Sequence, residues 1–173
     1  QSGRAAVKYI REKLNGKAKV AILAFKSQVP EQSEARSGGF KEALKELPGV
    51  QIVSEQDAWL AEMAVKRAGD ILTANPDLNI MWSANEGGTV GSVLAVKNSG
   101  RTGKVVVFGT DVSEQMLGFL KSNDNILQAT TAQRPYDVGV KAAETALKVI
   151  RKEPVEKKVV LPGLCLSRTE PDK

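Results

Sequence analysis

The sequence predicts an α/β fold, with a doubly wound parallel sheet flanked by helices. Short apolar runs alternate with stretches of helical periodicity along the chain, the links between them are short, and 42% of the 173 residues are hydrophobic. A chain of this length and composition can bury one core. Strands that alternate with helices pair as right-handed βαβ units, which bring the strands into a single parallel sheet.

The N-terminal third begins this alternation. Residues 4–14 place apolar side chains on one helical stripe, and an Asn-Gly pair ends the helix. Residues 20–25 are a continuous apolar run, which is typical of a strand covered on both faces. Residues 31–47 return to helical spacing and end at a Pro-Gly pair, after which residues 50–53 predict the second strand.

The middle third repeats the pattern twice. Residues near 59–74 predict a helix that an Asn-Pro pair ends, and residues 79–84 predict the strand after it. A glycine pair then precedes a helix at about 87–97, which is followed by an apolar strand at residues 104–109. Each strand is therefore separated from the next by one helix, as a parallel sheet requires.

The last third continues the same order. The sequence predicts a helix at about 112–121, a strand at residues 126–131, a helix at about 135–152 and a final strand near 158–164. We find no internal repeat and no low-complexity segment.

Composition excludes several classes of function. The formal charge is +5, but Lys and Arg mostly alternate with Glu and Asp, so we interpret them as solvated faces and predict no nucleic-acid partner. A single cysteine and no histidine leave no internal disulfide, no usual metal site and no usual general base. We therefore predict no cofactor. Because the chain opens on Gln1 and runs directly into a helical stretch, we expect it to be a piece of a longer protein, with any export signal upstream.

Candidate ligand-binding residues follow the strands. In a doubly wound sheet the ligand lies beyond the carboxyl ends of the strands, and five polar or aromatic residues are predicted there: Arg36, Trp59, Asn85, Asp111 and Gln133. Arginine donates, aspartate accepts, and the two amides do both, so together they suit the neighbouring hydroxyls of a sugar. A tryptophan ring covers the apolar face of such a ring.

Each of these residues also has a structural interpretation. Asn85 and Asp111 are of the types that cap helices. Trp59 would serve as a core residue or an anchor at a helix start, and Arg36 as half of a surface ion pair with a nearby glutamate. The proline two residues after Gln133 favours extended backbone there. The ligand-binding interpretation depends on all five lying on one edge of the sheet.

Six segments carry a resemblance to a known family. They are Ser2-Gly3-Arg4-Ala5-Ala6, Ala35-Arg36-Ser37-Gly38-Gly39-Phe40, Asn75-Pro76-Asp77, Ser83-Ala84-Asn85-Glu86, Phe108-Gly109-Thr110-Asp111, and the run from Ala129 to Gly139. In this order they resemble motifs in the C-terminal half of the ribose-type periplasmic binding proteins of ABC importers. The match runs along almost the whole chain.

The resemblance implies a two-lobed binding protein that is not an enzyme. Residues 1–132 would be the C-terminal ligand-binding lobe, and residues 133–173 a hinge-crossing segment with a helix at about 135–152 and a returning strand. Arg36, Asn85 and the other two polar candidates would hydrogen-bond a monosaccharide, and Trp59 would take the family's aromatic position. The protein would be periplasmic or otherwise extracytoplasmic and deliver its sugar to a membrane permease.

The same resemblance implies that the first lobe is missing from this chain. The apolar stripe of the helix at about 135–152 would then lack its usual cover and pair with the missing lobe or with a second copy of the chain. Two other functions stay open at this point. One is the effector domain of a lactose-repressor-type regulator. The other is an enzyme acting on phosphosugars, although the sequence has no phosphate loop or carboxylate pair to support it.

Overall fold

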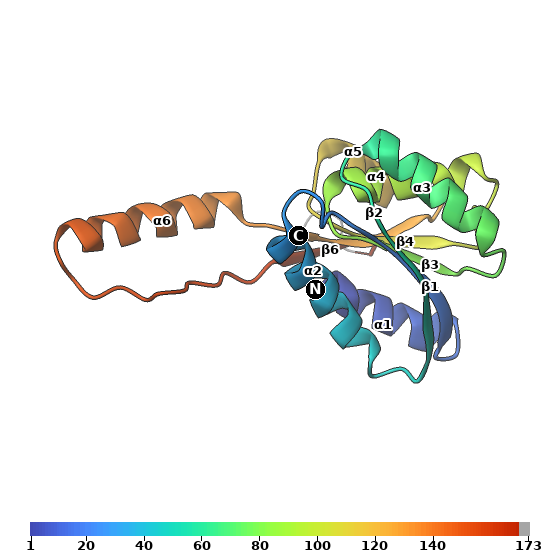
Figure 1. The fold of residues 1–173 in the computed structure, drawn as a ribbon, viewed down its shortest axis with the longest axis horizontal. Coiled ribbons are helices and arrows are strands. Elements are labelled where there is room, and N and C mark those ends of the chain that lie inside the picture. Colours follow the sequence, from blue (N-terminus) through green and yellow to red (C-terminus); the bar gives the residue numbers. More distant parts are fainter. Residues whose placement is uncertain (170–173) are drawn as a thin grey trace.

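The structure is a computed structural model that describes residues 1–169, so the last four residues of the predicted 133–173 segment lie outside the described residues. The described part alternates helices and strands (Figure 1). In chain order the elements are α1 (Ser2–Lys13), β1 (Lys17–Ala24), α2 (Pro30–Leu44), β2 (Gly49–Asp57), α3 (Ala61–Ala74), β3 (Ile80–Ser83), α4 (Glu86–Asn98), β4 (Val106–Thr110), α5 (Glu114–Lys121), β5 (Leu127–Ala132), α6 (Pro135–Ile150) and β6 (Leu164–Ser167).

The strands form one sheet in the order β2-β1-β3-β4-β5-β6. Neighbouring strands from β2 to β5 are parallel, with the crossovers made by helices. The predicted doubly wound α/β fold is therefore confirmed. The last strand runs in the opposite direction, since β6 pairs antiparallel with β5.

The final strand was predicted wrongly in position and direction. The sequence predicts it near residues 158–164, whereas β6 covers Leu164–Ser167 and pairs Leu164 with Ala132. The chain leaves the sheet at the carboxyl end of β5 and returns to that same end, so the only direction open to it is backwards along β5. Val160 belongs to the returning segment, where it is 73% exposed and forms no part of the sheet.

Two other boundaries also differ from the prediction. α2 ends at Leu44, before the predicted end at residue 47. β2 runs from Gly49 to Asp57, well past the apolar residues 50–53, and pairs with β1 to its end. β2 is an edge strand with solvent on its free side, so polar residues extend it without the apolar pattern that predicts a buried strand.

The core lies on both faces of the sheet. β1 shows this by alternation, because Ile22 packs with α1 and α2 on one face while Leu23 packs with α3, α4 and α5 on the other. Figure 1 shows the same division of the helices into two layers. Both side chains are completely buried, and burial of a side chain of this size contributes about 1.5–3 kcal/mol.

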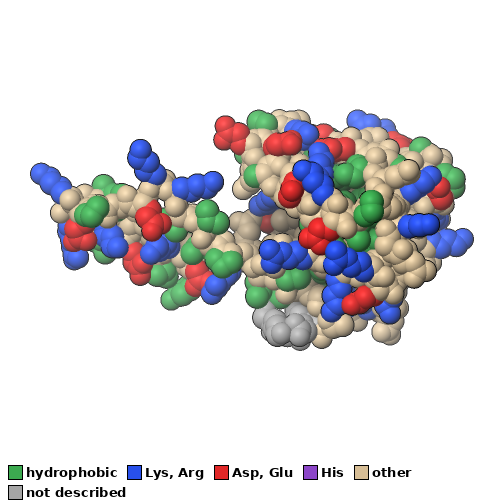
Figure 2. Space-filling model, turned by 90° about the horizontal axis from the view of Figure 1, so that it is seen from below, with side chains coloured by type: hydrophobic (Ala, Val, Ile, Leu, Met, Phe, Trp, Pro, Cys, Tyr) green, Lys and Arg blue, Asp and Glu red, His purple; other side chains and the backbone are tan. Residues whose placement is uncertain are grey.

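α6 stands apart from this body. The helix and the segment after it project away from the sheet before the chain returns to β6 (Figure 1), and α6 has no buried residue. Hydrophobic side chains lie at the surface of this projection (Figure 2). The larger exposed ones on α6 are Tyr136, Val138, Val140, Leu147, Val149 and Ile150. Within residues 1–169, we find no helix with the length and apolar character that crossing a membrane requires.

Candidate functional site

All five predicted site residues line one pocket of about 540 Å³ at the carboxyl edge of the sheet. Arg36 comes from α2, and Trp59 lies between β2 and α3. The other three follow β3, β4 and β5, one after each strand. The expectation that these residues share one edge is therefore confirmed, because parallel strands bring their carboxyl ends together. Their roles toward a ligand stay predictions.

Asp111 is the centre of a hydrogen-bond network in this pocket. Arg36 Nη1 donates to Asp111 Oδ2 over 3.2 Å, and Gln133 Nε2 donates to Asp111 Oδ1 over 2.6 Å. The backbone N–H of Glu86 also donates to Oδ2, at 3.3 Å. A second bond from Arg36 Nη1, to the carbonyl oxygen of Ala84 at 2.7 Å, fixes the guanidinium. The acceptor and its donors are thus gathered at one point on the pocket wall.

The backbone of Asp111 is held by the neighbouring strand. Its φ is +73°, in the left-handed region that aspartate adopts more readily than most residues. Its N–H donates to Thr131 O, and Thr130 Oγ1 donates to its carbonyl oxygen. The capping interpretation of Asp111 is wrong, because Ser113 caps α5 by accepting a hydrogen bond from Met116 N. The Asp111 carboxylate is therefore left to face the pocket.

Asn85, in contrast, is a helix cap. Its Oδ1 accepts from the N–H of Gly88 at 3.2 Å, so it satisfies one of the open donors at the start of α4. Its Nδ2 donates to the carbonyl oxygen of Trp59 at 2.8 Å. The side chain is nearly buried, with 6% of the residue exposed. Asn85 thus joins α4 to the loop that carries the aromatic residue.

Trp59 forms another wall of the pocket, and Phe25 lies behind it. Trp59 is 36% exposed and packs edge-to-face on the buried Phe25, with the ring centroids 5.1 Å apart. The guanidinium of Arg36 lies over the same Phe25 ring, 5.4 Å from its centroid. The alternative ion pair of Arg36 with Glu34 does not form, because Glu34 pairs with Lys26. Phe25, which the sequence marks only as the end of an apolar run, therefore connects two of the predicted site residues.

A charged cluster fixes the strand ends beside this wall. Glu55 on β2 lies 2.6 Å from Lys41 on α2 and 3.1 Å from Lys26, which follows β1. Burial by itself would raise the pKa of Glu55, but hydrogen bonds from Lys41 and Lys26 lower it below its ordinary value. Across residues 1–169, no group of His, Cys, Asp and Glu side chains is arranged to hold a metal ion.

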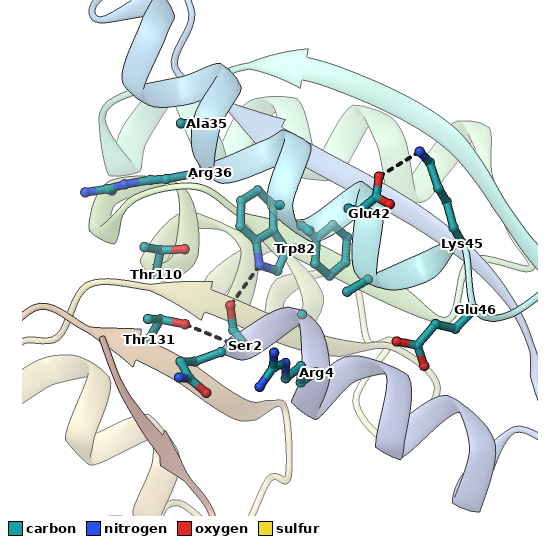
Figure 3. A pocket seen from close by; sticks show the side chains of 15 residues that line it. Ser2, Arg4, Ala35, Arg36, Glu42, Lys45, Glu46, Trp82, Thr110 and Thr131 are labelled. Carbon is teal, nitrogen blue, oxygen red and sulfur yellow. Dashed lines mark hydrogen bonds and ion pairs between the residues drawn. The ribbon is translucent and has the colours of Figure 1, made fainter. Parts of the chain in front are cut away.

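A second pocket, of about 730 Å³, lies where the chain enters and leaves this body (Figure 3). The indole N–H of Trp82 donates to Ser2 Oγ at 3.1 Å, and the N–H of Ser2 donates to Thr131 Oγ1 at 2.8 Å. Gly163 lies against the same threonine, since a Cβ there would be 2.7 Å from Thr131 Cγ2. Three segments far apart in sequence therefore meet at Thr131.

Sequence reasoning missed this junction. Its one available sign was Trp82, a tryptophan inside an apolar strand, because a buried indole N–H needs a hydrogen-bond partner. Trp82 is 2% exposed and stacks on Phe40 with the rings 4.6 Å apart. The sequence gives no indication that the partner would be Ser2.

The chain is similar to known proteins over most of its length. Residues 1–154 match the sequence profile of the family described as periplasmic binding protein domain. The chain is 31% identical over 173 residues to the ABC transporter periplasmic-binding protein YphF of Escherichia coli, covering 99% of this chain and 52% of that protein. It is 33% identical over 150 residues to the D-allose-binding periplasmic protein of the same organism, covering 86% and 46%.

A solved structure is similar over almost the whole chain. It is an ABC transporter periplasmic solute-binding protein from Actinobacillus succinogenes with bound D-allose. It superposes with a TM-score of 0.86 at 33% identity, covering 98% of this chain and 59% of that one. This chain spans about half the length of the curated relatives it matches.

Proposed function

This chain belongs to the periplasmic binding protein domain family, and on that basis we propose that it is the sugar-gripping C-terminal lobe of the solute-binding component of an ABC importer. The match over residues 1–154 confirms the resemblance that the six motifs predict. The relatives are named as binding proteins, which confirms the expectation of a binding protein and not an enzyme. The ligand that we propose is a monosaccharide.

The observation that carries the proposal is the network around Asp111. Its carboxylate accepts from Arg36 and Gln133 at the wall of a pocket of about 540 Å³, a volume in the range of small-molecule sites. These groups satisfy each other without a ligand, and each has further donors or lone pairs that sugar hydroxyls would engage. When a ligand covers these groups, a further donor or lone pair that meets no matching hydroxyl becomes buried and unpaired, at a cost of about 1–3 kcal/mol. Selectivity for polyols follows from that cost.

The proposal includes a second lobe that this chain does not contain. We propose residues 1–132 as the lobe and residues 133–173 as the hinge-crossing segment. Support comes from the exposed α6, from the meeting of three chain segments at Thr131, and from relatives about twice as long. The sugar would bridge the two lobes and select their closed form. The closed form would dock on a membrane permease, in the periplasm or another extracytoplasmic space.

A repressor's effector domain is the rival function. Two of the relatives described above are named as periplasmic proteins, which favours import. The sequence upstream of Gln1 in the parent protein discriminates the two functions. A helix-turn-helix there would make the protein a regulator, and a signal peptide would make it a component of an importer.

The test is a titration of the full-length parent protein with D-allose and D-ribose, followed by calorimetry of two variants. Asp111→Ala removes the acceptor at the centre of the network and should abolish binding with the fold intact. Asp77→Ala is the matched control, because that carboxylate precedes β3 at the opposite end of the sheet and pairs with Lys19. Unchanged affinity in Asp111→Ala would overturn the proposed site.

A further inference from the structure

Gly87, in the first turn of α4, lies against the loop that carries Trp59. A Cβ added at Gly87 would sit 2.3 Å from the carbonyl oxygen of Trp59 and 3.1 Å from Ala61 N. Both neighbouring atoms belong to the backbone, so no side-chain rotation relieves the overlap. Only glycine therefore permits the observed approach of the Trp59 loop to α4.

The close approach continues along the two helices. At Gly91, one turn further along α4, a Cβ would lie 2.4 Å from Ala64 Cβ and 2.7 Å from Ala61 O. The Nδ2 of Asn85 draws the same Trp59 carbonyl toward α4 with a hydrogen bond of 2.8 Å. The missing side chains at Gly87 and Gly91 allow this close approach, and the hydrogen bond from Asn85 holds it. Together they set the distance between the start of α3 and the start of α4.

If a side chain at position 87 filled the space between α4 and the Trp59 loop, the loop would move rather than α4. Most residues of α4 are buried, and Thr89 on α4 lies so close to β4 that a Cβ at Gly109 would be 2.4 Å from its methyl carbon. Trp59 and Leu60 are 36% and 56% exposed. A side chain at position 87 would therefore push the Trp59 loop outward and leave α4 in place.

From this geometry we infer that Gly87 is a positioning residue that determines which sugars the site accepts, by setting the depth of the Trp59 ring in the pocket. Phe25 connects that ring to Arg36, whose guanidinium donates to Asp111. With the ring at its observed depth, one unsubstituted sugar ring contacts the indole and the Asp111 network together. With the Trp59 ring displaced outward, a single sugar ring loses its contact with either the indole or the Asp111 network. This inference rests on the proposed sugar-binding function.

The first test needs no ligand, so its outcome is independent of the proposed function. The chain has two tryptophans, and Trp82→Phe leaves Trp59 as the only one. In that background, acrylamide quenching of Trp59 fluorescence should rise in Gly87→Ala. It should not rise in Gly69→Ala, a matched control on α3 where an added Cβ meets nothing within 4 Å. Equal quenching in the two variants would overturn the inference.

A second variant covers the case in which Gly87→Ala fails to fold. Asn85→Ser adds no bulk and retains a capping oxygen, but it removes the donor to the Trp59 carbonyl. Quenching of Trp59 should rise in this variant too, because the loop loses the bond that holds it against α4. A value equal to that of the parent protein would contradict the positioning role.

The second test measures sugar affinity in the full-length protein as a double-mutant cycle. Gly87→Ala should weaken binding of the preferred monosaccharide about tenfold, the loss expected of one aromatic contact. In a Trp59→Ala background the same substitution should have little further effect, because the ring through which it acts is gone. An equal loss in both backgrounds would show a general structural effect and overturn the inference. Absence of sugar binding in the unsubstituted protein would instead count against the proposed function, and the quenching test would still decide whether Gly87 positions Trp59.

Discussion

Substitution of Asn85 tests how much its side chain contributes to the stability of the fold. Asn85→Ala removes the cap of α4, which is worth about 1 kcal/mol. It also removes the hydrogen bond from Nδ2 to Trp59 O, which is worth about 1 kcal/mol. Asn85 is only 6% exposed, so water cannot readily replace either hydrogen bond. We expect the free energy of unfolding to fall by about 2 kcal/mol, the sum of these two terms.

A second variant separates the two bonds. Asn85→Asp keeps an oxygen that accepts from Gly88 N, and its charge is favourable at a helix N-terminus, but it has no N–H for the Trp59 carbonyl. We expect a loss of about 1 kcal/mol, the value of that one hydrogen bond, because repulsion between the new carboxylate oxygen and the Trp59 carbonyl oxygen opposes the gain from the charge. The assay is equilibrium urea denaturation of the chain at neutral pH, followed by tryptophan fluorescence and circular dichroism.

The order of stability among the three chains tests these two contributions. It should be highest for the unsubstituted chain, intermediate for Asn85→Asp and lowest for Asn85→Ala, with one denaturant slope for all three. If Asn85→Ala is as stable as the unsubstituted chain, the two hydrogen bonds contribute nothing net. If Asn85→Asp is the most stable, the bond to the Trp59 carbonyl is worth less than the gain from a charge at the helix N-terminus.

Two further predictions concern the packing of the core and the response of stability to pH. Leu120 is 1% exposed on α5 whereas Leu147 is 52% exposed on α6. Leu120→Ala should therefore cost about 2–5 kcal/mol in urea denaturation and Leu147→Ala less than about 0.5 kcal/mol, and equal losses would contradict an α6 without buried residues. The pKa of Glu55 is lower in the folded chain than its ordinary 4.5, so its contribution to stability is present above pH 4.5 and is lost as the pH falls through the folded pKa. Glu55→Gln should accordingly be less stable than the unsubstituted chain at pH 7 by up to about 1 kcal/mol, and a gap that persists at pH 2 would refute the ion-pair origin.

The order of elements was predictable because it depends on local pattern. Apolar runs of strand length and stripes of helical spacing are properties of neighbouring residues, and the parallel strands from β2 to β5 follow from helices that separate them. The direction of β6 was not predictable in the same way. It depends on where the chain comes from after α6, and the apolar residues around Val160 carry the same pattern whether or not they pair with β5.

The candidate site shows the same limit at the level of single residues. Arg36, Trp59, Asn85, Asp111 and Gln133 were placed together from the sequence because parallel strands end at one edge. Which of the two cap candidates does cap a helix was left open. The structure settles it, because α5 begins at Glu114 and its cap is Ser113, two residues after the left-handed Asp111.

By itself, the sequence determined the fold class, the family and the edge of the sheet at which the five candidates meet. Only the tertiary structure decided how they meet: Asp111 at the centre of the network, Phe25 between Trp59 and Arg36, and Gly87 beneath the Trp59 carbonyl. The physical reason is one of range. Periodicity and turn signals act over a few residues, whereas these contacts depend on the distance between elements that pack only after the chain has folded.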